Sequence, residues 1–278
     1  MSKSEIPVDA RPLFKPLDHL LIDFLKQLEP TDWNKQTVAK HWKVKDVATH
    51  LLDGNLRALS MQRDYYFGEN PPEIKGFRDL VEWLNQLNAD WVKATKRLSP
   101  AVLVMLLELS GEQVSEYYST LDPWEEAAFS VAWAGEATSY NWMHVAREYT
   151  EKWHHQQQIR DAMEDRTILS QQFFQPVINT FMLALPHTFR DVTASDGTII
   201  RVTVDADAGG TWWLKRAADQ WELVEQADRF DAAVNVPLDI SWKLFTKSLR
   251  PSQIQDQVTI EGDQRLAEKV LSMVSVMA

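Results

Sequence analysis

The spacing of apolar residues divides the chain into two parts with different periodicity. Up to about residue 165, apolar side chains recur every three or four positions, which predicts amphipathic helices. From about residue 186 to residue 262, apolar and polar side chains alternate between turn residues, which predicts strands. The charged stretch 164–167 separates the two patterns. We therefore predict two domains, 1–166 and 167–278.

The first part contains four main predicted helices. They span about residues 13–28, 44–66, 76–97 and 138–163. Ser99 followed by Pro100 is typical of an N-cap and a first helical position, so a further helical stretch is expected to begin there.

The second part has an α+β pattern. Between residues 198 and 205, Ile200, Val202 and Val204 lie on one face, as in a half-buried strand. The other predicted elements are strands at about 211–215, 220–225, 232–236 and 257–261, and helices at about 170–185, 238–246 and 264–276.

Composition narrows the function classes. The net charge is −11, which disfavours nucleic acid as a partner because phosphate binding needs a basic surface. We find no run of about 18 apolar residues and no signal-peptide pattern, so we expect no membrane partner and a soluble cytoplasmic protein. The chain has no cysteine, which excludes disulfides, thiolate metal sites and a catalytic thiol of its own. The sequence leaves the oligomeric state open.

The last main helix carries polar side chains on one narrow stripe. His144, Glu148, Glu151 and His155 lie within an arc of about 60°, because each residue turns a helix by about 100°. Side chains four positions apart are neighbours, so Glu151 and His155 can bind one metal ion. His154 lies off this stripe, and we therefore favour His155 as the ligand. Helical bundles build metal sites from such side chains on facing helices.

A third ligand is available on the predicted helix 44–66. His50 is the candidate, and Asp46, one turn earlier, is placed to orient its ring. Three protein ligands leave a coordination position open, as in catalytic zinc sites.

The same spacing also fits an interpretation in which this helix carries no metal site. The apolar residues of the last main helix lie on nearly the opposite face from the His/Glu stripe; they are Trp142, Val145, Tyr149 and Trp153. A polar face exposed to solvent would explain the stripe without any metal. His50 would then be a half-buried helix residue with no ligand role.

Two motifs resemble a known family. The stretch Trp42-x-Val-x-Asp-Val-Ala-x-His50-Leu-Leu resembles the first metal-ligand motif of the DinB-like superfamily. Glu151-x-x-x-His155, followed by Gln-Gln-Gln-Ile-Arg160, resembles the second motif in the branch named after mycothiol-dependent maleylpyruvate isomerase. Trp133-Ala-Gly-Glu136 is also similar to that branch, and residues 258–271 resemble its small sterol-carrier-like domain.

This resemblance implies a fold and a chemistry. The fold is a DinB-like four-helix bundle followed by a small α+β sterol-carrier-like domain. The metal ligands are His50, Glu151 and His155, and the ion is usually Zn²⁺, although Ni²⁺, Fe²⁺ and Mn²⁺ suit the same donors. The family uses a low-molecular-weight thiol such as mycothiol as cofactor or co-substrate, so the implied enzyme is an isomerase or S-transferase acting on a small electrophilic substrate.

The remaining polar residues and functions stay open. His144, Glu148 and Arg160 are candidates for contacts to the ligands or the substrate, and for Arg160 we favour a structural ion pair. A metal-dependent hydrolase on the same site is one alternative. The other is a non-enzymatic protein that binds apolar ligands. Its tryptophans would line a pocket, although we favour core packing for them; they are Trp212, Trp213, Trp221 and Trp242.

Overall fold

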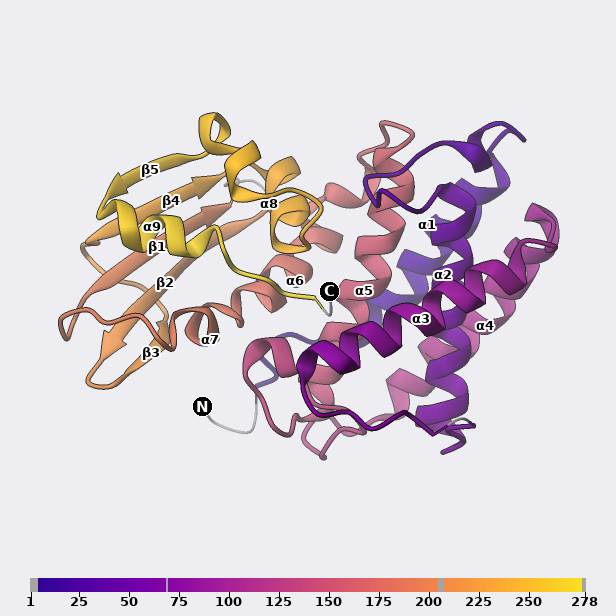
Figure 1. Cartoon of the computed structure of the whole chain (residues 1–278), viewed down its shortest axis with the longest axis horizontal. Coiled ribbons are helices and arrows are strands. Elements are labelled where there is room, and N and C mark those ends of the chain that lie inside the picture. The colour runs from indigo at the N-terminus through magenta and orange to yellow at the C-terminus, as the bar shows by residue number, and fades with distance from the viewer. Residues whose placement is uncertain (1–4, 69, 205–207, 277–278) are drawn as a thin grey trace.

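The computed structural model describes residues 5–68, 70–204 and 208–276. A group of helices forms one side of the molecule, and a sheet with its own helices forms the other (Figure 1). This confirms the predicted fold class of a helical part followed by a small α+β part. None of the helices in the described ranges combines the length and hydropathy needed to cross a bilayer.

The bundle consists of α1 (Phe14–Lys26), α2 (Val44–Arg57), α4 (Pro100–Thr120) and α5 (Asn141–Asp161). Helix α1 packs against α4, and α2 packs against both α4 and α5. Helix α3 (Phe77–Thr95) packs against α2 from outside.

One bundle member therefore differs from the sequence analysis. We counted the segment that forms α3 among the four main helices and treated α4 only as a further stretch. Among the side chains described in α3, only Thr95 is buried, whereas α4 buries one broad face along its whole length, including Leu103, Leu107 and Val114. The regular apolar spacing of α3 reflects one face laid on α2, and it does not indicate a place in the core.

The predicted second helix is also shorter. Helix α2 ends at Arg57 and continues as a π-helical turn, η3 (Ala58–Arg63). Single π turns of this kind are frequent near functional sites because they rotate the following side chains relative to a regular helix. Here the turn carries Gln62, which is buried and contacts α5.

The sheet has the strand order β3-β2-β1-β4-β5. Strands β1 and β4 are parallel, and the other neighbours are antiparallel. Ile200, Val202 and Val204 are fully buried on one face of β1, as predicted. Their bounds are β1 (Ile199–Val204), β2 (Gly210–Ala217), β3 (Gln220–Val224), β4 (Ala232–Val236) and β5 (Thr259–Gly262). Asp205, the last residue of the predicted first strand, lies outside the described residues.

Four helices accompany the sheet. They are α6 (Gln171–Met182), α7 (Leu185–Phe189), α8 (Leu238–Phe245) and α9 (Gln264–Val270). The last ends earlier than predicted, because Ser275 bonds to the backbone oxygens of Phe245 and Phe181 and ties the following segment to other elements. The short helical turns are η1 (Arg11–Leu13), η2 (Asp32–Asn34), η4 (Ala132–Ala134), η5 (Thr167–Leu169), η6 (Pro251–Gln253) and η7 (Gln255–Gln257).

Helix α5 joins the two parts of the molecule. Its Trp153 is fully buried and lies with its ring 5.5 Å from Phe174 of α6 and 6.2 Å from Trp242 of α8, centroid to centroid. Lys243 of α8 pairs with Asp161 at 2.6 Å. Burial of Trp242 and Trp221 agrees with the core role favoured for the tryptophans, whereas Trp212 and Trp213 are only half-buried. The apolar face of α5 is therefore covered by α6 and α8 around Trp153 and by Phe14 of α1 at Tyr149, and its other face lies against the bundle. The boundary at residue 166 stays a prediction.

Candidate active site

The polar stripe of α5 faces the interior of the bundle. His144 is 1% exposed, and the side chains of Glu148, Glu151 and His155 are 20%, 27% and 13% exposed. The interpretation of this stripe as a solvent-exposed face is therefore wrong. The reason is that α5 is covered on both sides. Its apolar face packs in the core, and its polar face lies against the other bundle helices.

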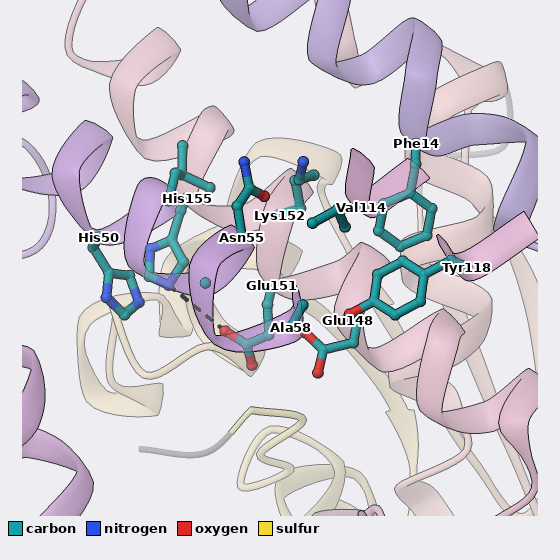
Figure 2. A pocket seen from close by; sticks show the side chains of 12 residues that line it. Phe14, His50, Asn55, Ala58, Val114, Tyr118, Glu148, Glu151, Lys152 and His155 are labelled. Carbon is teal, nitrogen blue, oxygen red and sulfur yellow. Dashed lines mark ion pairs between the residues drawn. The ribbon is translucent and has the colours of Figure 1, made fainter. Parts of the chain in front are cut away.

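Helix α2 brings His50 to the same place. The rings of His50 and His155 lie 4.5 Å apart at an angle of 81°, and the Nε2 atom of His155 is 3.6 Å from a carboxylate oxygen of Glu151. Figure 2 shows these three side chains converging at one end of a pocket. The ring of Trp42 lies 4.7 Å from that of His50 and covers it.

The His50 ring is held neutral. Burial is the main cause that lowers the pKa of His50 well below its usual value, and the unfavourable electrostatic interaction that its protonated ring would have with His155, Arg57 and His154 adds to it. Its Nδ1 atom is buried and has no hydrogen-bond partner among the described residues. A buried polar atom without a partner is costly, and the neutral imidazole is the form that binds metal ions. The donor set of two imidazoles and one carboxylate therefore fits a divalent metal ion.

Gln158 connects His155 to His154. The Nδ1 atom of His155 lies 2.9 Å from Oε1 of Gln158, and the Nε2 atom of Gln158 lies 3.0 Å from Nε2 of His154. An amide oxygen only accepts and an amide nitrogen only donates. His155 therefore carries its proton on Nδ1, which leaves the Nε2 lone pair directed toward Glu151. Metal-binding histidines are usually fixed by such a partner on the other nitrogen.

The same bonds distinguish two neighbouring histidines. Ligand atoms of Glu151, His154 and His155 all lie within 4.8 Å of one another, so proximity alone admits either ring. In His154, however, Nε2 accepts the Gln158 amide proton, so Nδ1 holds the hydrogen. This hydrogen-bond pattern leaves a ring nitrogen of His155 free to face Glu151, and the choice of His155 over His154 stays a prediction. Gln158 had no role in the sequence analysis, although its spacing of three and four residues from the two rings is the signal that could have revealed it.

Asp46 and Arg160 have structural partners. Asp46 accepts a hydrogen bond from the backbone nitrogen of Lys43 at 3.0 Å and caps the start of α2, in place of the predicted contact to His50. Arg160 donates to Asp165 at 2.5 Å and to the backbone oxygen of Leu20 at 2.7 Å. It forms the structural ion pair that the sequence favoured.

His144 and Glu148 belong to a second polar group beside the first. His144 Nε2 contacts Gln62 at 2.8 Å, and Gln62 donates to Glu148 at 3.3 Å. Arg147 reaches both Nδ1 of His144 at 2.9 Å and Glu148 at 2.6 Å. Burial and then the charge of Arg147 lower the pKa of His144 to about 4. The ring is thus neutral, and it donates to Gln62.

A cavity of about 60 Å³ runs between α2 and α5 and connects the two polar groups. That volume has room for roughly four to six waters. The lining residues are Phe14, His50, Leu51, Gly54, Asn55, Ala58, Val114, Tyr118, Glu148, Glu151, Lys152 and His155. The cavity admits a small reacting group beside the histidines, and the rest of a larger molecule would extend outside.

Fold and site together define a two-part protein in which a helical bundle holds a half-buried histidine–carboxylate cluster beside a small α+β domain. Residues 14–160, over half of the chain, match the family model described as the mycothiol maleylpyruvate isomerase N-terminal domain. The chain belongs to this family. No curated protein matches the chain at a significant level.

Solved structures show the same fold over nearly the whole length. The structure of the mycothiol-dependent maleylpyruvate isomerase has a TM-score of 0.54 and 12% identity, and the match covers 90% of this chain and 91% of that one. A histidine-to-alanine mutant of a protein with that name matches with the same TM-score and coverage at 11% identity. The sterol carrier protein domain 2 of Helicoverpa armigera covers 34% of this chain and 81% of its own, at 16% identity and a TM-score of 0.27, which is too low to support an argument.

Proposed function

We propose that this chain is a divalent-metal-dependent enzyme that uses an external low-molecular-weight thiol, such as mycothiol, in an isomerisation or S-transfer on a small electrophile. His50, Glu151 and His155 would hold the metal. The observation that carries the proposal is their convergence from α2 and α5 at one end of a partly open cavity, where the Nδ1 atom of His50 has no hydrogen-bond partner among the described residues. The family membership supports it.

A divalent ion held by His50, Glu151 and His155 would supply Lewis-acid chemistry that favours the thiolate form of an external thiol, which is the nucleophilic form. The chain has no cysteine, so the thiol must come from outside. The residues of the chain provide the setting: Gln158 fixes the His155 ring, and Trp42 shields His50 from water. At the other end of the cavity, Gln62 and Arg147 hold the Glu148 carboxylate in place.

The first test is the metal content of tag-free protein, measured by mass spectrometry. We expect about one equivalent of a divalent metal per chain in the wild type and its loss in His155→Ala. His154→Ala is the matched control, because it removes the neighbouring ring from the same helix. This variant should keep the metal. Absence of metal from the wild type, even after reconstitution with Zn²⁺, Ni²⁺, Fe²⁺ or Mn²⁺, would refute the proposal.

The second test separates thiol chemistry from hydrolysis. Turnover of a small electrophile should require added mycothiol or another small thiol, and it should disappear with a chelator. Turnover that needs the metal but no thiol would contradict the proposal and would identify a hydrolase on the same site. Unchanged activity in His50→Ala and His155→Ala would rule out both.

A further inference from the structure

The cationic side chains at the cavity are already neutralised by carboxylates. Lys152 lines the cavity, and its Nζ atom lies 2.6 Å from each carboxylate oxygen of Asp18. The two side chains are only 8% and 12% exposed. An ammonium group held by both oxygens of a buried carboxylate has little charge left for a second anion.

A glycine in α4 makes room for this pair. A Cβ atom at Gly111 would lie 2.8 Å from Oδ2 of Asp18, which is closer than a side chain tolerates. Glycine inside a helix is unfavourable relative to alanine, so its presence here needs a reason. The close approach of Asp18 to α4 supplies one, and it shows that the position of Asp18 opposite Lys152 is built into the packing.

The second cation is held in the same manner. Arg147 donates to Glu148 at 2.6 Å and also reaches His144. Burial alone would raise the pKa of Glu148, but Arg147, His144 and Gln62 outweigh it and lower the pKa. Glu148 therefore lines the cavity as a carboxylate.

The rest of the wall is apolar and small. Gly54 of α2 and Ala58 at the start of η3 leave a slot opposite α5, and a Cβ atom added at Gly54 would meet nothing within 4 Å. Phe14, Val114 and Tyr118 close the cavity from α1 and α4. At the histidine end, Glu151 and an incoming thiolate together carry two negative charges, which balance the charge of one divalent ion.

We infer that the electrophile accepted by this cavity is uncharged, and that a carboxylate-bearing electrophile is rejected because Lys152 and Arg147 are already paired with Asp18 and Glu148. This inference rests on the proposed function and specifies its substrate class. A negatively charged group would lie among Glu148, Glu151 and the Asp18–Lys152 pair without a free cation among the described lining residues.

Chloroacetamide and chloroacetate test this charge preference, because they are small and differ mainly in charge. In both reactions the thiolate sulfur attacks the carbon that bears chlorine. The C–S bond forms as the C–Cl bond breaks, chloride leaves with the electron pair, and the thiol proton goes to solvent. The chain has no cysteine that either reagent could alkylate.

The assay compares metal-loaded enzyme with saturating mycothiol on each reagent. Each kcat/KM is divided by the uncatalysed rate constant, which removes the difference in intrinsic reactivity. We expect the enhancement for chloroacetamide to exceed that for chloroacetate by at least about tenfold. Asp18→Asn should narrow this ratio, because it releases the charge of Lys152 into the cavity. Asp23→Asn, an equal change of charge at an exposed position of the same helix, should leave the ratio unchanged.

Glu148→Gln is the second variant if Asp18→Asn does not fold, and it should narrow the ratio by removing a cavity carboxylate and freeing Arg147. Equal or greater enhancement for chloroacetate in the wild type would overturn the inference and leave the proposed function standing. The inference would also be overturned if Asp18→Asn and Glu148→Gln both fold and neither changes the ratio of the chloroacetamide to the chloroacetate enhancement. Absence of enhancement with both reagents would overturn this inference together with the S-transfer form of the proposed function, whereas metal binding and thiol-dependent isomerisation are tested separately by the experiments above.

Discussion

Replacement of Gln158 by leucine gives the sharpest test of how the histidines are oriented. Gln158 is 4% exposed and bonds to both His155 and His154. Leucine has a similar volume but neither donates nor accepts. The variant therefore removes the acceptor of the His155 Nδ1 proton with little change in packing, and the ring loses its preference for directing Nε2 toward Glu151.

The size of the effect follows from that one lost bond. A buried donor left without an acceptor costs about 1–3 kcal/mol. At about 1.4 kcal/mol per factor of ten, this corresponds to roughly a 5- to 150-fold weaker Kd for the metal. Loss of outer hydrogen-bond partners of metal ligands typically weakens binding by about 10- to 100-fold. We therefore expect Gln158→Leu to raise the Kd by about 10- to 100-fold.

Competition against a chromophoric chelator measures this Kd directly, without reference to activity. Gln157→Leu is the matched control. It changes a buried residue of the same type on the same helix, whose Oε1 atom has no partner in the described structure. Gln158→Glu keeps an acceptor for His155 and should stay close to the wild-type Kd. A Kd in Gln158→Leu within about threefold of the Gln157→Leu value would refute the orientation argument.

The remaining predictions concern stability. Gly111→Ala should destabilise the fold by about 1–3 kcal/mol in chemical denaturation because its Cβ atom would crowd Asp18. Gly54→Ala, whose Cβ atom meets open space, should stabilise the fold by about 0.5–1 kcal/mol. A Gly111→Ala variant more stable than Gly54→Ala would contradict the packing described. The pKa of His144 falls from 6.5 to about 4 on folding, so its contribution is full above pH 6.5 and is lost as the pH falls toward 4. That loss is roughly 3 kcal/mol. His144→Gln should remove this part of the pH dependence. The measurement is the free energy of unfolding of both proteins, from denaturation curves between pH 4 and 7. If the two proteins lost stability equally as the pH falls, the His144 ring would not be buried in its neutral form.

Local sequence patterns predicted the bounds and buried faces of single elements better than they predicted which elements pack together. The strand Ala232–Val236 has the predicted bounds, and the alternation of Ile200, Val202 and Val204 correctly gave the buried face of β1. These features depend on residues adjacent in the chain. The placement of α3 outside the bundle was missed, because an apolar stripe shows that a helix covers something but does not show what it covers.

The candidate site illustrates the same limit more sharply. Spacing alone brought Glu151 and His155 onto one stripe, His50 was the candidate third ligand on the predicted helix 44–66, and the motif resemblance supported all three. The structure places them together. Spacing could not show that this stripe faces the bundle and is at least half-buried. A polar helix face opposite the apolar Trp153 would by its polarity alone be assigned to solvent. Contacts between distant segments decide this, and a helical wheel does not contain them.

Burial of α5 on both faces gives the C-terminal part a structural role in the site. Trp242 of α8 lies with its ring 6.0 Å from that of His154. His154 is in turn fixed by Gln158, which orients His155. The wall that excludes water behind the histidines is therefore supplied by the sheet-containing part, while the candidate ligands all come from α2 and α5. A bundle without that wall would expose Trp153 and His154 to water. The buried amide–imidazole bonds would then compete with solvent, so the ring orientation would lose the definition on which metal binding depends.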